Sequence, residues 1–400
     1  MPREGAPIHP ISVERMLNVP EHSVVLRLPN QNGLTIKQTS AGPVDDSIIV
    51  IKMLSAGVCG TDLAILSGAR SGQAEILGHE GVGVVVHAPK EFRVAKGARL
   101  IINPVHRKKP HVVIGHSRDG VFREWFCIDA ADADEGGFLV PCPRECSLED
   151  VELALAEPVA SALYSLELLR ENCGTASLLI RGSGTMAILA AKLWSTLTGS
   201  NAILVSKSKA HVQWLRESAH WPTNVRICHT TALPNTIRES TSSSDLKAGI
   251  LCCSRESAPE GLGLLFNFLQ KGATIDLMAG FPAEYREPRL GGVALDAIRW
   301  NNVCGVSSAP PNAVLDRSSG KTCFLIGHRG TAERHILQAI DLLSRRVISI
   351  ADVPYRRLTL EELPSVVNQM LSTQTRHHTK WVKAIVAFSQ DSGGERIGDC

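Results

Sequence analysis

Strand-like and helix-like patterns alternate through the middle of the chain, and this alternation restricts the fold more than any other feature. Apolar runs of strand length occupy 176–182, 201–207, 224–229, 246–254 and 273–280. Segments with apolar residues at helical spacing, such as 185–197 and 261–270, separate them. Neighbouring parallel strands need a long crossover between them. The pattern therefore predicts an α/β domain in which helices wrap a parallel sheet.

The first of these runs leads into a glycine-rich turn at the start of a helix. Residues 182–187 read GSGTMA and fit the spacing GxGxxA. Glycines there permit a tight turn and a close approach of the backbone to a pyrophosphate, and the helix N-terminus offers free N–H groups to the anion. The alternative is a plain strand–helix turn in an unrelated α/β protein. The predicted dinucleotide contacts are Gly182, Ser183, Gly184, Thr185 and Met186.

The end of the second strand bears on the choice of cofactor. Sites that prefer NAD usually have a carboxylate there to accept from the ribose hydroxyls. This chain has Ser206-Lys207-Ser208-Lys209 instead. Ser206, Lys207 and Lys209 would suit a 2′-phosphate, so we predict NADP(H) in preference to NAD(H). The alternative is a solvated pair of lysines.

The N-terminal part of the chain has a different sequence pattern. Between residues 23 and 141, short β-rich runs alternate with turn residues, which predicts a barrel of antiparallel strands. From Ser147 to Glu171 the apolar spacing predicts a helix with Ser147 as its N-cap. Two helices (331–346 and 360–373) and a strand (379–389) are expected near the C-terminus, and we expect this part to return to the barrel.

Four regions follow from these patterns. They are a flexible arm at 1–20, a barrel domain at 21–160 and 325–390, a parallel-sheet domain at 161–324, and a flexible tail at 391–400. We expect the active site in the cleft between the two domains.

Three short motifs precede the glycine turn. They are CGTD, which contains Cys59, GHEGVG, which contains His79 and Glu80, and EPVASAL, which begins at Glu157. Each alone reads as a buried cysteine, a satisfied histidine or a first-turn glutamate. In this order and ahead of the glycine turn, they resemble the zinc-dependent medium-chain dehydrogenase/reductases, the alcohol, polyol and threonine dehydrogenase group. The resemblance covers residues 20–390.

The resemblance implies a GroES-like β-barrel catalytic domain and a Rossmann domain with a doubly wound parallel sheet. It implies that Cys59, His79 and Glu157 bind one catalytic zinc, with Glu80 as an alternating or outer ligand. Three such ligands leave a fourth position for water or a substrate oxygen. Such a zinc polarises a carbonyl or acidifies an alcohol while a hydride moves to or from the nicotinamide.

Further roles come from the same resemblance. Thr61 stands where the family has the hydroxyl that starts a proton relay, but Ala64 stands where the relay's histidine would be. Ser161 is expected near the nicotinamide and Lys383 near the pyrophosphate. Gly280 is expected in the later Rossmann segment that contacts the cofactor.

The chain departs from the family between Pro104 and Arg118. Many members carry there a lobe with four cysteines and a structural zinc, whereas this segment contains no cysteine. We therefore predict no structural zinc. We interpret His106, His111 and His116 as loop residues, with a packing role as the alternative for His116. The basic cluster at 107–109 is open to three interpretations: a solvated face, a contact for an acidic substrate group, or a contact for a partner subunit.

Composition narrows the class of partner. The chain has 42 Lys and Arg against 40 Asp and Glu, and only 4% aromatic residues, which argues against a nucleic-acid surface. Eleven cysteines without CxxC spacing favour a reducing compartment, so we predict a cytoplasmic protein. No apolar run reaches about 18 residues, so we expect no membrane span. The expected partners are a small-molecule substrate and, by the resemblance, further copies in a homodimer or homotetramer.

These observations lead to one function and two alternatives. The function is a zinc-dependent, NADP(H)-linked oxidoreductase acting on a secondary alcohol or ketone, with a polyol, cyclitol, sugar or sugar phosphate as substrate. One alternative is a non-catalytic cofactor-binding sensor or scaffold of the same fold. The other is a zinc-free quinone or enoyl reductase.

Overall fold

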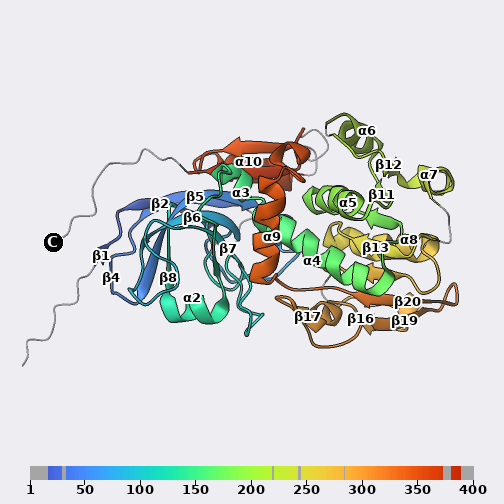
Figure 1. The fold of residues 1–400 in the computed structure, drawn as a ribbon, viewed down its shortest axis with the longest axis horizontal. Helices are drawn as coiled ribbons and strands as arrows, with labels where there is room; N and C mark the ends of the chain where they lie inside the picture. Colours follow the sequence, from blue (N-terminus) through green and yellow to red (C-terminus); the bar gives the residue numbers. More distant parts are fainter. Residues whose placement is uncertain are drawn as a thin grey trace, which may run out of the picture.

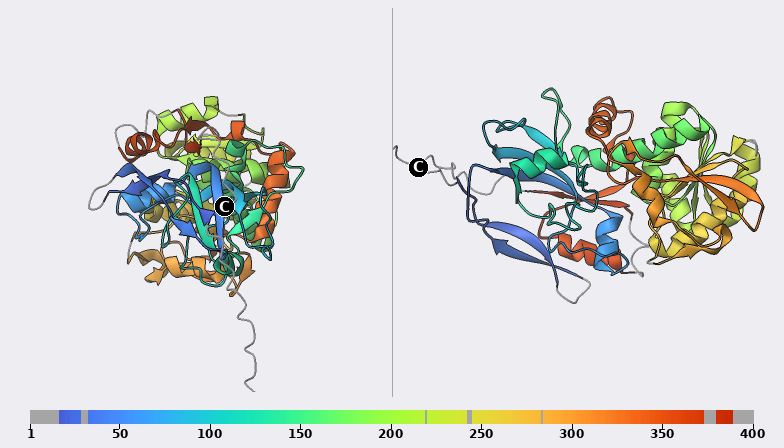
Figure 2. Two further views of the ribbon diagram at one scale, coloured as in Figure 1. Left: turned by 90° about the vertical axis from the view of Figure 1, so that its left-hand side faces the viewer. Right: turned by 90° about the horizontal axis from the view of Figure 1, so that it is seen from below.

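The computed structural model describes residues 17–28, 33–218, 220–241, 245–282, 284–372 and 380–388. The tail predicted at 391–400 and most of the arm predicted at 1–20 lie outside these residues. The described chain forms two lobes side by side along the long axis, one built from its N-terminal half and the other from its middle (Figures 1 and 2).

The first lobe is a mainly antiparallel sheet folded around one long strand, β5. The strand order is β21-β22-β5-β6-β7-β9, and β8 also pairs with β5. β22 runs antiparallel to β5, so the C-terminal strand lies in the first lobe. The bounds are β2 (His22–Arg27), β3 (Leu34–Thr39), β5 (Ile48–Val58), β6 (Glu80–His87), β7 (Arg99–Ile102), β8 (Trp125–Asp129), β9 (Leu139–Pro141), β21 (Tyr355–Leu358) and β22 (Lys383–Ala387).

The second lobe is the parallel sheet that the sequence predicts. Its strand order is β12-β11-β10-β13-β14-β20-β19, so the chain winds outward from β10 in both directions. Only β19 is antiparallel; it forms a hairpin with β20 that the sequence analysis did not predict. The bounds are β10 (Leu178–Arg181), β11 (Ala202–Ser206), β12 (Val225–His229), β13 (Ala248–Leu251), β14 (Thr274–Asp276), β19 (Asn312–Asp316) and β20 (Lys321–Ile326). The predicted boundary at 324 falls inside β20.

Helices cover both faces of the parallel sheet (Figure 1). In Figure 1, α4 and α9 lie where the two lobes meet. The bounds are α1 (Gly60–Leu66), α2 (Ala130–Gly136), α3 (Asp150–Leu153), α4 (Ala156–Cys173), α5 (Thr185–Thr198), α6 (Lys209–Ser218), α7 (Leu233–Ser240), α8 (Ala258–Phe268), α9 (Glu333–Ser344) and α10 (Leu363–Leu371). Within the described residues, no helix is both long and apolar enough to cross a membrane.

The single helix predicted from Ser147 is wrong in one respect, because the structure divides it into α3 and α4. Pro158 lies in the first turn of α4. Proline lacks an N–H, and its ring collides with the carbonyl four residues earlier, here that of Ala154. The helix therefore ends at Leu153 and restarts at Ala156. The N-cap of α3 is Glu149, whose N–H donates to Glu152 Oε2 at 3.1 Å, and not Ser147.

One hydrophobic core is shared between the lobes. It joins residues of the first sheet, such as Val82 and Ile101, to α4, α5 and α9 through side chains such as Leu163 and Trp194. The break before α4 thus places the start of a shared helix, and with it Glu157, at the junction of the lobes.

Candidate active site

A buried carboxylate organises the two motifs around Cys59 and His79. Cys59 is the N-cap of α1, and its N–H donates to Asp62 Oδ2 at 2.8 Å. Asp62 Oδ1 accepts from the N–H of Gly78 at 3.2 Å and lies 3.3 Å from His79 Nδ1. Asp62 is 1% exposed, so it fixes both segments from inside the lobe.

Three potential metal ligands converge beside this carboxylate. The ligand atoms of Cys59, His79 and Glu80 all lie within 4.8 Å of one another. Zinc binds sulfur at about 2.3 Å and nitrogen or oxygen at about 2.0–2.2 Å, so small rotations of these side chains would bring all three atoms to one ion. Burial lowers the pKa of His79, but the negative charges of Asp62 and Cys59 outweigh it and raise the pKa well above its usual value. Thiolate, imidazole and carboxylate are a donor set that fits zinc.

Glu80 is also half of a buried ion pair. Its Oε2 contacts Lys383 Nζ, and both residues are 2% exposed. Lys383 also donates to the carbonyl of Val58 at 3.1 Å. Burial lowers the pKa of Lys383, but the charge of Glu80 outweighs it and raises the pKa. A side chain on Gly57, which lies opposite Glu80 in the sheet, would overlap Glu80 Oε2.

Lys383 was expected near the pyrophosphate, and its side chain instead contacts Glu80. Its chain neighbour does meet the glycine turn, because the carbonyl of Val382 accepts from Thr185 Oγ1 at 3.2 Å. The predicted pyrophosphate contact of Lys383 stays a prediction.

Glu157 faces the same site without joining the three-ligand group. It lies in the first turn of α4 and is half-buried. Burial, and then the charge of Glu80, raise the pKa of Glu157 to about 7. Its predicted role as third ligand is therefore untested by this geometry, while Glu80 is the carboxylate placed beside Cys59 and His79.

Two hydroxyls border the cluster. Thr61 Oγ1 lies 3.7 Å from Cys59 Sγ. Ser161 lies one turn after Glu157 on α4, and its Oγ is 3.3 Å from His328 Nε2. His328 is 4% exposed, and burial lowers its pKa to about 3, so its imidazole is neutral.

His328 is a site residue that the sequence reasoning missed. It lies in the run Gly327-His328-Arg329-Gly330, directly after β20. Polar residues that follow a parallel strand lie at the edge of the sheet where ligands bind. That signal was present in the sequence.

The glycine turn has the geometry that its spacing predicts. Gly182 has φ +155°, and a Cβ there would lie 2.5 Å from the carbonyl oxygen of Cys252. Gly184 is the N-cap of α5, and a Cβ there would meet no atom within 4 Å. The helix N-terminus is thus open where a pyrophosphate is expected.

The region expected to hold a 2′-phosphate contains a carboxylate that the sequence reasoning missed. Lys207 forms an ion pair with Glu260, which lies in the first turn of α8. Ser206 Oγ donates to Ser183 Oγ at 3.2 Å, and Lys209 is exposed. Glu260 is far from the strand end in sequence, so local reading could not find it.

Gly280 lies beneath an arginine. A Cβ on Gly280 would lie 2.5 Å from Arg255 Nη2, and Arg255 also donates to the carbonyl of Phe281 at 2.6 Å. The predicted contact of Gly280 with the cofactor stays a prediction.

The basic cluster at 107–109 is held by its own lobe. Arg107 donates to the carbonyls of Asp134 and Glu135, and Lys108 and Lys109 pair with the Glu135 carboxylate. His106 is buried and accepts from the N–H groups of both lysines.

His116 has a different position from the rest of that segment. Its ring packs edge-on against His79 with 4.8 Å between the ring centroids. Burial lowers its pKa far below the usual value, so it is neutral. His116 is therefore a packing residue of the site itself.

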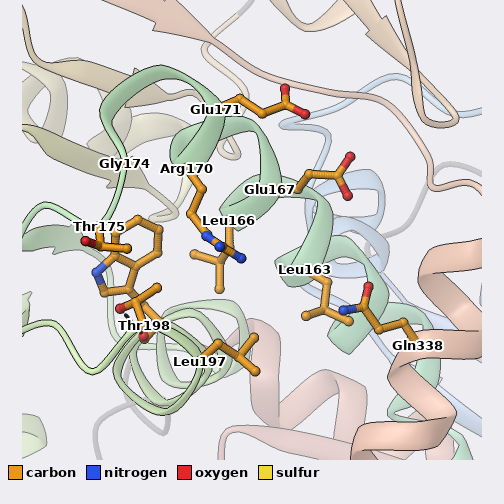
Figure 3. A pocket seen from close by; sticks show the side chains of 11 residues that line it. Leu163, Leu166, Glu167, Arg170, Glu171, Gly174, Thr175, Leu197, Thr198 and Gln338 are labelled. Atoms are coloured by element: carbon orange, nitrogen blue, oxygen red, sulfur yellow. Dashed lines mark hydrogen bonds between the residues drawn. The ribbon is translucent and has the colours of Figure 1, made fainter.

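A separate cavity of about 380 Å³ lies outside this constellation. It opens between α4, α5 and α9 and is lined by side chains such as Leu166, Arg170 and Leu197 (Figure 3). Its lining includes none of the residues of the ligand cluster, so we do not assign the reaction to it.

Comparisons with known proteins agree with this architecture. The family described as alcohol dehydrogenase GroES-like domain matches residues 45–135. L-threonine 3-dehydrogenase of Streptomyces avermitilis is 26% identical over 207 residues, which cover 46% of this chain and 56% of that protein. D-arabinitol dehydrogenase 1 of Uromyces fabae is 23% identical over 199 residues, covering 48% and 56%. The chain spans about half the length of the curated relatives it matches.

The resemblance in three dimensions is more extensive. The crystal structure of L-idonate 5-dehydrogenase from Escherichia coli superposes with a TM-score of 0.66 at 16% identity. The alignment covers 93% of this chain and 99% of that one. At this identity the likeness shows a common fold with both lobes in place.

Proposed function

Because the chain belongs to the zinc-type medium-chain dehydrogenase/reductases, we propose that it is a nicotinamide-dependent oxidoreductase acting on a secondary alcohol or ketone. The observation that carries the proposal is the convergence of Cys59, His79 and Glu80 at the junction of the lobes. The glycine turn in the second lobe supports it, because its open helix N-terminus suits a dinucleotide.

The chain's own residues divide the work as follows. Cys59, His79 and a carboxylate from Glu80 or Glu157 would hold one zinc. A zinc ion bound there would supply a Lewis acid for the substrate oxygen, and the nicotinamide would give or take the hydride. Thr61 and Ser161 would hydrogen-bond to the substrate or cofactor. Asp62 orients the metal ligands, and Lys383 forms a buried ion pair with Glu80.

The proposed substrate is polyhydroxylated: a polyol, cyclitol, sugar or sugar phosphate. A glutamate near the metal position supports this class, as do relatives named for threonine, arabinitol and idonate. The proposed cofactor is NADP(H) in preference to NAD(H), with Ser206, Lys207 and Lys209 at the 2′-phosphate. Glu260 opposes this preference, since Lys207 must leave it to reach a phosphate.

A metal measurement and a substrate panel test the proposal. We expect one zinc per chain by elemental analysis, and we expect both zinc and turnover to be lost in Cys59→Ala. Cys146→Ala is the matched control, because Cys146 lies outside the cluster. Two zincs per chain would contradict the prediction that the structural-zinc lobe is missing. Full turnover without metal would favour a zinc-free reductase, and zinc without turnover on any hydroxylated substrate would favour the sensor.

The remaining expectations are proposals of the same kind. We propose a barrel domain at 21–160 with 325–390, a Rossmann domain at 161–324, and a cytoplasmic homodimer or homotetramer. Light scattering on the purified protein measures the oligomeric state.

A further inference from the structure

Four arginines from separate segments lie around the candidate active site without carboxylate partners. All four are half-buried. Across the residues that the structure covers, none of them forms an ion pair, whereas other arginines such as Arg118 and Arg289 do. They are Arg70, Arg255, Arg299 and Arg329.

Arg70 reaches the site from the first lobe. It follows α1, and its Nη2 lies 3.4 Å from His116 Nδ1. His116 in turn packs against His79. Arg70 is therefore one side chain away from the ligand cluster. His116 is neutral, so it does not balance the arginine's charge.

Arg299 and Arg329 reach the site from the second lobe. Arg299 Nε donates to the carbonyl of His328 at 3.3 Å, and the side chain of His328 contacts Ser161 on α4. The Arg329 guanidinium lies over the ring of Trp300, 4.0 Å from its centroid. Stacking on an aromatic face orients a guanidinium while leaving its N–H groups free for an anion.

The arginines are close enough to repel one another. Burial, and then the charges of the other arginines, lower the pKa of Arg70 and of Arg299 to about 10. The opposing carboxylates act only from a distance: Asp276 on Arg299, and Asp296 on Arg299 and Arg329. Asp276 is itself engaged by Ser165, and burial raises its pKa to about 6. Like charges held together at a half-buried site are unfavourable unless a ligand supplies the opposite charge.

We propose that the substrate carries a phosphate or carboxylate group, and that Arg70, Arg299 and Arg329 bind this group beside the Cys59–His79–Glu80 cluster. The inference rests on the proposed oxidoreductase function. It narrows the substrate from hydroxylated compounds in general to anionic ones. Guanidinium forks suit both anions, because each presents two oxygens to paired N–H donors.

The position of Arg70 favours the substrate over the cofactor as the ligand of this site. Arg70 belongs to the lobe that holds the metal ligands, whereas the glycine turn and Lys207 belong to the other lobe. Arg255 follows β13, the neighbour of the glycine-turn strand, so we leave it out of the substrate site.

Matched substrate pairs test the inference on the zinc-loaded protein. Each pair joins a neutral polyol or ketose to its phosphate ester or to the corresponding sugar acid, assayed with both cofactors. We expect kcat/KM for one anionic member to exceed that of its neutral partner by about 100-fold or more. The phosphate and acid arms decide which anion is natural. Equal kcat/KM within each pair would overturn the inference and leave the proposed function standing.

Charge-removing variants supply a second readout. Arg70→Gln and Arg329→Gln should raise KM for the anionic substrate by about 30-fold each, with smaller changes in kcat. KM for the neutral partner and for the cofactor should stay within a factor of about three. Arg345→Gln, which removes an exposed arginine on the far end of α9, is the control. A rise in the cofactor's KM instead would assign the arginines to the cofactor and overturn the inference.

A binding measurement separates this inference from the proposed function. Inorganic phosphate at millimolar concentration should raise the Tm of the wild-type protein, and it should protect Arg70→Gln less. Arginine-dependent protection without turnover on any substrate would refute the oxidoreductase proposal while supporting an anion site. Equal protection of both proteins would count against the arginine site. If a glutamine variant fails to fold, Arg70→Lys keeps the charge and loses the fork, so KM should still rise.

Discussion

The two ends of the site are built in different ways. At the metal end, buried side chains hold one another in place: Asp62 contacts Cys59 and His79, and Lys383 pairs with Glu80 inside the lobe. At the cofactor end, Lys207 and Glu260 pair near the surface, with exposed fractions of 43% and 62%. The side chains of the metal end are therefore held in place by buried contacts. At the cofactor end, the ion pair is exposed, and solvent weakens the attraction between its charges.

The largest effect should come from breaking the buried pair. Lys383→Met leaves the buried Glu80 carboxyl group without its partner, so we expect the free energy of unfolding of metal-free protein to fall by about 4 kcal/mol. Urea unfolding measures it, with the exposed Lys209→Met as control. The double variant Glu80→Gln/Lys383→Met should recover much of the loss. A loss below about 1 kcal/mol would mean that the metal end is no more rigid than the cofactor end.

The second lobe also contains a buried ion pair. It tests whether all of the second lobe, or only the cofactor end of the site, is less rigidly held than the metal end. Arg289 donates to both oxygens of Asp316, at 3.0 and 2.6 Å. Burial opposes ionisation of Asp316, but hydrogen bonds from Arg289 and two serines outweigh it and hold the pKa well below its usual range. Asp316→Asn should therefore lower the free energy of unfolding by about 3 kcal/mol at neutral pH.

The sign of the pH dependence follows from that lowered pKa. The contribution of Asp316 is complete above its unfolded pKa of about 3.9 and is lost as the pH falls towards the folded value. The difference in the free energy of unfolding between the wild type and Asp316→Asn should therefore become smaller as the pH falls. Asp341→Asn, which removes an exposed partner of Arg345, should cost below about 0.5 kcal/mol at any pH. A difference in unfolding free energy that does not change with pH would show that the charge of Asp316 is not the source of its stabilising effect.

Crowding at the metal end gives a smaller effect. Gly57→Ala places a methyl group against Glu80 and Lys383, so we expect a loss of about 2 kcal/mol and weaker zinc retention. Gly60→Ala is the control, because a Cβ there meets nothing within 4 Å. Equal stability of the two variants by urea unfolding would mean that the ion pair shifts freely.

The smallest effect is expected at the cofactor end. Glu260→Gln frees Lys207, so the ratio of kcat/KM for NADP(H) to that for NAD(H) should rise by about fivefold, in line with a screened charge pair. Stability should change little. Glu256→Gln, on the neighbouring turn, should leave the ratio unchanged. No change in Glu260→Gln would remove Lys207 from the 2′-phosphate site.

The same contrast describes how far the sequence predicts the molecule. Alternating strands and helices and the glycine turn depend on local spacing, and the structure confirms the parallel sheet. Motif order brought Cys59 and His79 together correctly. Local spacing does not reveal contacts between distant segments: Glu260 with Lys207, His328 with Ser161, and the arginines near the ligand cluster. The break at Ala154 was missed because apolar periodicity continues through it, although Pro158 carried the steric signal.

The shared helix α4 also bears on how such a protein could be recombined. Because α4 packs into a core that contains side chains from both lobes, a chimera joined anywhere along it would expose apolar surface to water on one side. The interruption at Ala154–Leu155 is the exception, since the hydrogen-bond ladder is already broken there by Pro158. A chimera that exchanges the second lobe between relatives should therefore be joined at Ala154–Leu155. The exchanged segment would then contain all of α4, including Glu157 and Ser161, together with the parallel sheet.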